Sequence, residues 1–231
     1  SPKPDQLVET PLRGRKLTAT LVGGFSENKT SVAAAWLGGQ HTGMKINARE
    51  SSDKVEVYDA GAHWRIVDTP GLYGHKGGET SAEEIKFKEI TRRYVSEANI
   101  VLYVMNGLNP LKDSHKEELE WLFRELDLLP RTVFVLGRFD EVADMDDDEE
   151  YEKALRIKQE NVTGRLRALI GLTDNETKQL SIVGVSGSPF GKGLAHWKER
   201  PEEFAKLSRI DTLRQAVEQK IDALGGAARI L

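Results

Sequence analysis

Short apolar runs alternate with longer amphipathic segments along most of the chain. Residues 99–105 (NIVLYVM) and 132–136 (TVFVL) are almost continuously apolar, and residues 16–22 alternate before becoming apolar. Runs of this kind are typical of parallel strands that are covered on both faces of a sheet. Three further strands are predicted at residues 55–58, 63–67 and 180–185.

Segments with helical periodicity lie between these runs. Residues 29–37 are rich in alanine and end at Gly38 and Gly39, which favours a helix with a glycine stop. Ser114, followed three residues later by Glu117, matches a capping box at the start of a helix. Helices are predicted at residues 29–37, 82–96, 114–129 and 149–170, with one or two more within 201–224.

Strands that alternate with helices predict an α/β fold, a doubly wound and mostly parallel sheet with helices on both faces. We expect one domain over residues 1–231, with an N-terminal segment at 1–15 and a helical insertion or extension at 143–180. Ligands of such sheets bind where the strands end, and the motifs below all follow strands.

The segment 23–30 (GGFSENKT) follows a predicted strand and precedes a predicted helix. It matches the phosphate-binding pattern G-x-x-x-x-G-K-[ST] at every position but one. Gly23 would let the backbone turn, and Lys29 would contact β- and γ-phosphate oxygens. The Thr30 hydroxyl would bind Mg²⁺. A glycine-rich turn beside an unrelated lysine is the alternative.

Asn28 is the position that departs from this pattern, which has glycine there. Asparagine is among the residues that tolerate unusual backbone angles best. Asn28 is therefore expected either to fit with weakened affinity or to obstruct the phosphates.

A second motif, D-T-P-G, ends the predicted strand at 63–67. Asp68 could hold Mg²⁺ through a water, and the Gly71 amide could donate to a γ-phosphate. Taken alone, the four residues also suit a plain turn.

Composition narrows the function classes. A formal net charge of −4 argues against a general nucleic-acid binder. The absence of cysteine excludes disulfides and thiolate metal sites. Residues 1–10 are polar and no apolar run reaches membrane-spanning length, so we expect a cytoplasmic protein without a signal peptide. Membrane contact is expected to be peripheral only, through parts absent from this chain.

The phosphate loop with its following Ser31 (GGFSENKTS) resembles that of dynamins, within the translation-factor-like P-loop GTPases. Residues 109–116 (NPLKDSHK) and 134–142 (FVLGRFDEV) are similar to bacterial dynamin-like proteins, and the labile-enterotoxin-output GTPases are the narrower family suggested. The resemblance implies a domain that binds GTP and GDP with Mg²⁺.

The family's guanine motif, N-K-x-D, maps onto residues 137–140 (GRFD). The resemblance implies that Asp140 accepts hydrogen bonds from guanine and that Arg138 replaces the stacking lysine. Gly137 cannot replace the asparagine, so the preference for guanine is expected to be loosened. A plain helix-capping role for Asp140 is the alternative. The last motif maps onto residues 185–187, where Ser186 and Gly187 would touch the base.

The resemblance also assigns the rest of the site. Ser26 matches a dynamin loop serine that would act near the attacking water, and Ser52 is the candidate for the second Mg²⁺ ligand, with Thr42 as its rival. Lys29, Ser26 and Ser52 are thus the catalytic candidates. The phosphate-loop contacts expected besides Gly23 are Phe25, Ser26, Glu27, Asn28, Lys29, Thr30 and Ser31.

Leu72 and Phe25 occupy the positions at which a water-positioning glutamine would stand, so we expect slow intrinsic hydrolysis. A homodimer across the nucleotide face could supply the missing groups. His75 and Lys76 are candidates, and a role as solvated loop residues is the favoured alternative for both. The alternative function is a degenerate or nucleotide-free interaction module, which Asn28 and Gly137 favour.

Overall fold

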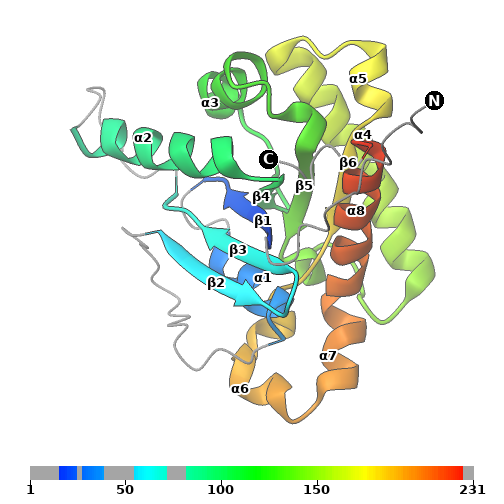
Figure 1. Cartoon of the computed structure of the whole chain (residues 1–231). Helices are drawn as coiled ribbons and strands as arrows, with labels where there is room; N and C mark the ends of the chain where they lie inside the picture. Colours follow the sequence, from blue (N-terminus) through cyan, green and yellow to red (C-terminus); the bar gives the residue numbers. More distant parts are fainter. Residues whose placement is uncertain (1–15, 25–27, 39–54, 72–81, 226–231) are drawn as a thin grey trace, which may run out of the picture.

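The computed structural model describes residues 16–24, 28–38, 55–71 and 82–225, which form a sheet flanked by helices (Figure 1). Six strands follow the order β2-β3-β1-β4-β5-β6. All neighbours are parallel except β2 and β3, which form an antiparallel hairpin. The strands are β1 Leu17–Val22, β2 Glu56–Ala60, β3 Trp64–Asp68, β4 Ile100–Asn106, β5 Thr132–Gly137 and β6 Ser181–Gly184.

Each predicted strand is present within two residues of its predicted bounds, and the expected doubly wound α/β fold is confirmed. The central strands β4 and β5 are buried along almost their whole length, as their continuous apolar runs indicated. Tyr103, Phe123 and Phe134 form an aromatic cluster against them, with ring centroids 5.3 to 5.8 Å apart.

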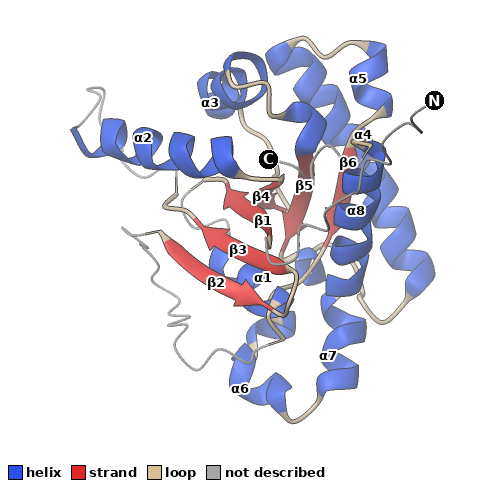
Figure 2. Ribbon diagram, in the orientation of Figure 1, coloured by secondary structure: helices blue, strands red, loops and turns tan. Residues whose placement is uncertain are grey.

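The helices form a layer on each side of the sheet (Figure 2). α1 and α8 contact each other and cover one face, and α2, α3 and α4 flank the other. The main helices are α1 Lys29–Trp36, α2 Ala82–Glu97, α3 Lys116–Glu120, α4 Asp148–Ile170, α5 Asp174–Lys178, α6 Gly193–Lys198, α7 Pro201–Ser208 and α8 Ile210–Ala223. No helix in the described part of the chain is long and apolar enough to cross a membrane.

The predicted capping box at Ser114 is wrong. Ser114 lies inside a 3₁₀ turn, Asp113–His115, and α3 begins only after it. The segment then widens into a π-helical turn at Trp121–Glu125. A single regular helix over 114–129 is therefore replaced by three short pieces, because packing of Leu119, Leu122 and Phe123 against the core overrides the local cap signal.

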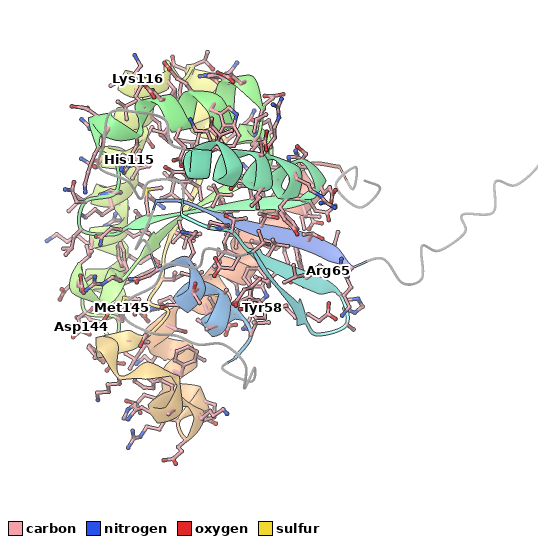
Figure 3. The ribbon with its side chains drawn as sticks, turned by 90° about the vertical axis from the view of Figure 1, so that its left-hand side faces the viewer. Tyr58, Arg65, His115, Lys116, Asp144 and Met145 are labelled. Atoms are coloured by element: carbon pink, nitrogen blue, oxygen red, sulfur yellow. The ribbon has the colours of Figure 1, made fainter. Side chains whose placement is uncertain are left out.

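Two peripheral regions lie on different sides of the molecule. Figure 3 shows Tyr58 and Arg65 on the β2–β3 hairpin, far from His115 and Lys116 at the start of α3. Asp144 and Met145 lie beside the α6–α7 region in the same view. There Lys206 of α7 pairs with Asp146 at 2.5 Å, so the acidic segment before α4 is held against α7.

Candidate functional site

The end of β1 turns sharply into the phosphate loop at Gly23. A Cβ atom at this position would lie 2.1 Å from the Val104 carbonyl oxygen, which belongs to the neighbouring strand β4. That distance is impossible for real side chains, so β1 can end against β4 only with glycine there. The sequence pattern and the packing of the sheet thus require the same residue.

Asn28 opens α1 in the left-handed conformation, with φ 60° and ψ 30°. Glycine adopts such angles most easily, and asparagine is among the other residues that do so most often. The Asn28 carbonyl accepts the first helical bond, from Val32 N–H at 3.1 Å. The backbone at this departure from the pattern is therefore shaped as a glycine would shape it.

Lys29 is buried and folds back over its own loop. Its Nζ donates to the Gly24 carbonyl at 3.0 Å and lies 3.4 Å from the Gly23 carbonyl. Both of these acceptors are neutral carbonyls, and an ammonium group can exchange such partners for phosphate oxygens, which bind it more strongly.

Thr30 and Asp68 meet although 38 residues separate them in sequence. The Thr30 hydroxyl donates to Asp68 Oδ2 at 2.5 Å. Burial raises the pKa of the Asp68 carboxyl above its ordinary value, while the Thr30 hydrogen bond and the Lys29 ammonium oppose the shift. The sequence placed both residues at one metal site, and the structure brings them together.

This pair fits Mg²⁺ by its chemistry. Asp68 Oδ1 is buried and has no hydrogen-bond partner among the described residues. A carboxylate oxygen and a hydroxyl are the hard ligands that Mg²⁺ takes, and this ion usually keeps waters and phosphate oxygens for its other positions. The described part of the chain holds no cluster of three or more acidic or histidine side chains that would form an all-protein metal cage.

Thr69 ties the second motif to the first and was not singled out by the sequence. Its side chain is fully buried, and its hydroxyl donates to the Leu21 carbonyl at 2.6 Å. Cα register also pairs Leu21 with Asp68. The end of β3 is thereby fixed beside the end of β1. A threonine directly after the acidic residue is the only signal that could have indicated this role.

The guanine motif follows β5, as predicted. The carbonyl of Gly137 accepts from Gly107 N–H at 2.8 Å, which joins this motif to the loop after β4. Arg138 adopts a left-handed conformation with φ 53°, and its guanidinium pairs with Glu141. The Arg138 side chain, expected to stack on the base, is 50% exposed and forms a local ion pair in this structure.

Asp140 is half-buried and joins the guanine motif to the loop after β6. Its Oδ2 accepts from the Phe190 backbone N–H at 2.8 Å. The carboxylate thus has one oxygen engaged by a backbone donor, the kind of donor that a guanine edge also presents. Phe190 itself was missed by the sequence reasoning, although an aromatic residue between glycines in a loop after the last motif is a visible signal.

Ser186 and Gly187 lie where the guanine half of the site meets the phosphate half. Ser186 N–H donates to the Ser208 carbonyl at 3.0 Å, at the junction of α7 and α8. A Cβ atom at Gly187 would lie 2.5 Å from the backbone carbon and oxygen of Ser31 in α1. The predicted base loop and the predicted phosphate helix are therefore in direct contact.

Some predicted site residues lie outside the described part of the chain, and their roles remain predictions. They are Phe25, Ser26, Glu27 and Ser52, together with the rival Thr42 and the dimer candidates His75 and Lys76.

Comparison with solved structures places this geometry among P-loop GTPases. The chain is 37% identical to LeoA, a bacterial dynamin GTPase from ETEC, with a TM-score of 0.72. The match covers 89% of this chain and 36% of LeoA, so the chain spans about a third of that protein. The chain has the fold of P-loop GTPase domains and resembles a bacterial dynamin over most of its length, as its motifs predicted.

More distant structures share the fold. Toc33 from Arabidopsis thaliana, in complex with GDP and Mg²⁺, has a TM-score of 0.55 at 15% identity, covering 89% of this chain and 86% of Toc33. Era from Aquifex aeolicus, bound to GDP and AlF₄⁻, has a TM-score of 0.53 at 16% identity, covering 75% of this chain and 52% of Era. A search among curated proteins gave no match.

The family model described as "Dynamin-like helical domain" matches residues 172–231. Within the described residues this stretch supplies the edge strand β6 of the sheet and the helices α5 to α8. The matched segment therefore begins inside the α/β fold, before α5 and before β6, the strand that Ser186 and Gly187 follow.

Proposed function

We propose that this chain binds guanine nucleotide with Mg²⁺ and hydrolyses GTP to GDP slowly, as the G domain of a cytoplasmic dynamin-like protein. The observation that carries the proposal is the buried contact of Thr30 with Asp68 at 2.5 Å beside the buried Lys29. Two sequence motifs converge there, and each supplies a group that a nucleoside triphosphate and its metal require.

The phosphate half works by charge and position. Lys29 leaves the carbonyls of its own loop and takes phosphate oxygens, and the first amides of α1 donate to the same group. Thr30 and Asp68 hold Mg²⁺, which when bound neutralises negative charge on the phosphate oxygens. Gly71, half-buried after β3, places its amide near the γ-phosphate and loses that partner after hydrolysis.

The guanine half supplies selectivity. Asp140 accepts from the base, and the backbone of Ser186 and Gly187 lines the base loop. Since Gly137 brings no side chain, one of the family's contacts is missing, and discrimination against other bases is weaker. Hydrogen bonds to a charged group such as the Asp140 carboxylate are worth about 1.5–3 kcal/mol, so a preference for guanine remains.

Hydrolysis is slow in an isolated chain because a water-positioning glutamine is absent from the matching positions, where Phe25 and Leu72 stand. Ser26 near the water and Ser52 on the metal complete the catalytic set. Dimerisation of two chains across the nucleotide face raises the rate. The test is GTP turnover at rising protein concentration, and a specific activity independent of concentration would contradict a role for the dimer.

Calorimetric titration with GTP, GDP and ATP, with and without Mg²⁺, tests the binding site. We expect saturable guanine binding that Lys29→Ala removes. Lys220→Ala is a matched control, since Lys220 is also buried and its Nζ also donates to a backbone carbonyl, that of Gln179 at 2.8 Å. If neither protein binds any nucleotide, or if Lys220→Ala is as damaging as Lys29→Ala, the proposed site is wrong.

Asn28→Gly separates an impaired site from an interaction module that uses no nucleotide. The backbone at this position is already left-handed, so glycine changes the side chain and not the shape of the loop. A large gain in GDP affinity would therefore report a side chain that intrudes on the phosphates. Unchanged, negligible affinity would favour the interaction module.

A further inference from the structure

The loop after β6 presents an aromatic side chain to solvent in a strained conformation. Phe190 has φ 56° and ψ 20°, in the left-handed region that bulky residues rarely adopt. Its side chain is 56% exposed, so burial in the core does not compensate for this conformation. Strain of this kind without packing is a reason to look for a ligand.

Hydrogen bonds hold the loop in this shape. Phe190 N–H donates to Asp140 Oδ2 at 2.8 Å, and Gly191 N–H donates to the Ser188 carbonyl at 2.9 Å. Gly193 N–H donates to Ser188 Oγ at 3.0 Å, which closes the loop on its other side. The backbone of Phe190 is thus held next to the acidic residue assigned to guanine, and its ring remains exposed.

In the guanine motif, the residue expected to stack on the base is engaged in an ion pair, and one side chain is absent. The Arg138 guanidinium pairs with Glu141, and Gly137 carries no side chain. Lys192 Nζ lies 5.9 Å from the centroid of the Phe190 ring, so a cation already approaches this ring. Phe190 is the aromatic residue whose backbone N–H is hydrogen-bonded to Asp140.

We propose that the Phe190 ring stacks on the nucleobase of the bound nucleotide and adds affinity to a guanine motif that lacks one of its usual side chains. The proposal rests on the proposed function, since it concerns the same site. It divides recognition between two residues. Asp140 selects the base through hydrogen bonds, and Phe190 adds affinity that is nearly independent of the base, because every base has an aromatic face.

The test measures the affinity of the full chain for GDP, inosine diphosphate and ADP by calorimetry. Phe190→Ala should weaken all three by a similar factor, about tenfold or more, because loss of base stacking has effects of that order. Phe190→Trp should retain the affinity and Phe190→Leu should lose it, which separates stacking from apolar bulk. Ile157→Ala is the control, since Ile157 is 58% exposed on α4, away from the base loop.

Three outcomes would overturn the inference, and the measurements distinguish them. If the unmodified chain binds GDP and loses it with Lys29→Ala, but Phe190→Ala and Phe190→Leu bind within twofold of it, stacking is refuted and the proposed function stands. If the unmodified chain binds no nucleotide, both fall. A melting temperature close to that of the unmodified chain excludes misfolding as the cause of lost binding. A loss of affinity in Phe190→Trp also counts against the proposal.

Discussion

Replacing Gly187 with alanine changes the contact between the base loop and α1 by a single methyl group. Gly187 is buried, and its added Cβ would lie 2.5 Å from the backbone carbon and oxygen of Ser31. Both atoms belong to a helix backbone, so no flexible side chain can move away. Restoring an ordinary contact of 3.4 Å requires the loop and the helix to separate by about 0.9 Å.

The expected cost has two parts. Overpacking of this kind destabilises a fold by about 1–3 kcal/mol. A displacement of about 1 Å in groups that position a substrate can lower catalytic efficiency by about a hundredfold. Because the separation falls between the two halves of the site, we expect Gly187→Ala to lower kcat/KM for GTP by about 10- to 100-fold, with a smaller effect on folding.

Gly164→Ala is the matched control. Gly164 lies within α4, and a Cβ there would meet no atom within 4 Å. Alanine is the better helix former, so this variant should be more stable by about 0.5–1 kcal/mol, with unchanged GTP turnover. Single-turnover and steady-state GTP hydrolysis, with urea unfolding of each variant, make the comparison. Unchanged kcat/KM in a folded Gly187→Ala protein would refute the assigned contact.

Three further changes test the framework around the site. The Arg124 side chain, with a backbone hydrogen bond, lowers the pKa of Glu176 from 4.5 to about 2. The carboxylate therefore stabilises the fold above pH 4.5, and this stabilisation is lost as the pH falls toward 2. Glu176→Gln should lower the free energy of unfolding in urea by about 1 kcal/mol at pH 7 and progressively less on acidification. Arg209 has φ 54° and lies 4.5 Å from the ring of a tyrosine in α4, so Arg209→Gly should lower the melting temperature less than Arg209→Ala, because alanine keeps the strain. Gly23→Ala should lower the melting temperature far more than Gly61→Ala, since both have positive φ but only Gly23 would clash with the β4 backbone; equal shifts would contradict the packing argument.

The strands were predictable from sequence because burial on both faces leaves an unambiguous pattern. Residues 100–106 and 132–137 carry apolar side chains at nearly every position, and only a covered strand of that length accommodates them. The segment after residue 112 was less predictable. Its cap signal at Ser114 is local, whereas the 3₁₀ and π turns there follow from tertiary packing that no short window contains.

The phosphate half of the site followed from sequence for a related reason. Gly23, Lys29, Thr30 and Asp68 belong to motifs fixed to strand ends, and strand ends meet when the sheet forms. Phe190 and Thr69 carry only weak sequence signals by comparison, and their importance emerges from the structure. Their roles depend on hydrogen bonds across the fold, to Asp140 and to β1, that no spacing rule records.

The two departures from the family pattern differ in what they change. Asn28 alters a side chain while the backbone keeps the left-handed shape of a glycine, so its effect is limited to the space near the phosphates. Gly137 removes a side chain, but its backbone remains paired with Gly107 and β5 keeps its register. Neither change disturbs the contact of Ser31 with Gly187, through which the two halves of the site are held together. Asp68 is buried, its Oδ2 accepts from Thr30, and its Oδ1 has no partner among the described residues, which is a costly arrangement for a carboxylate. That unfavourable burial is best explained by a cation and a phosphate at the same place, and this favours the GTPase over the interaction module.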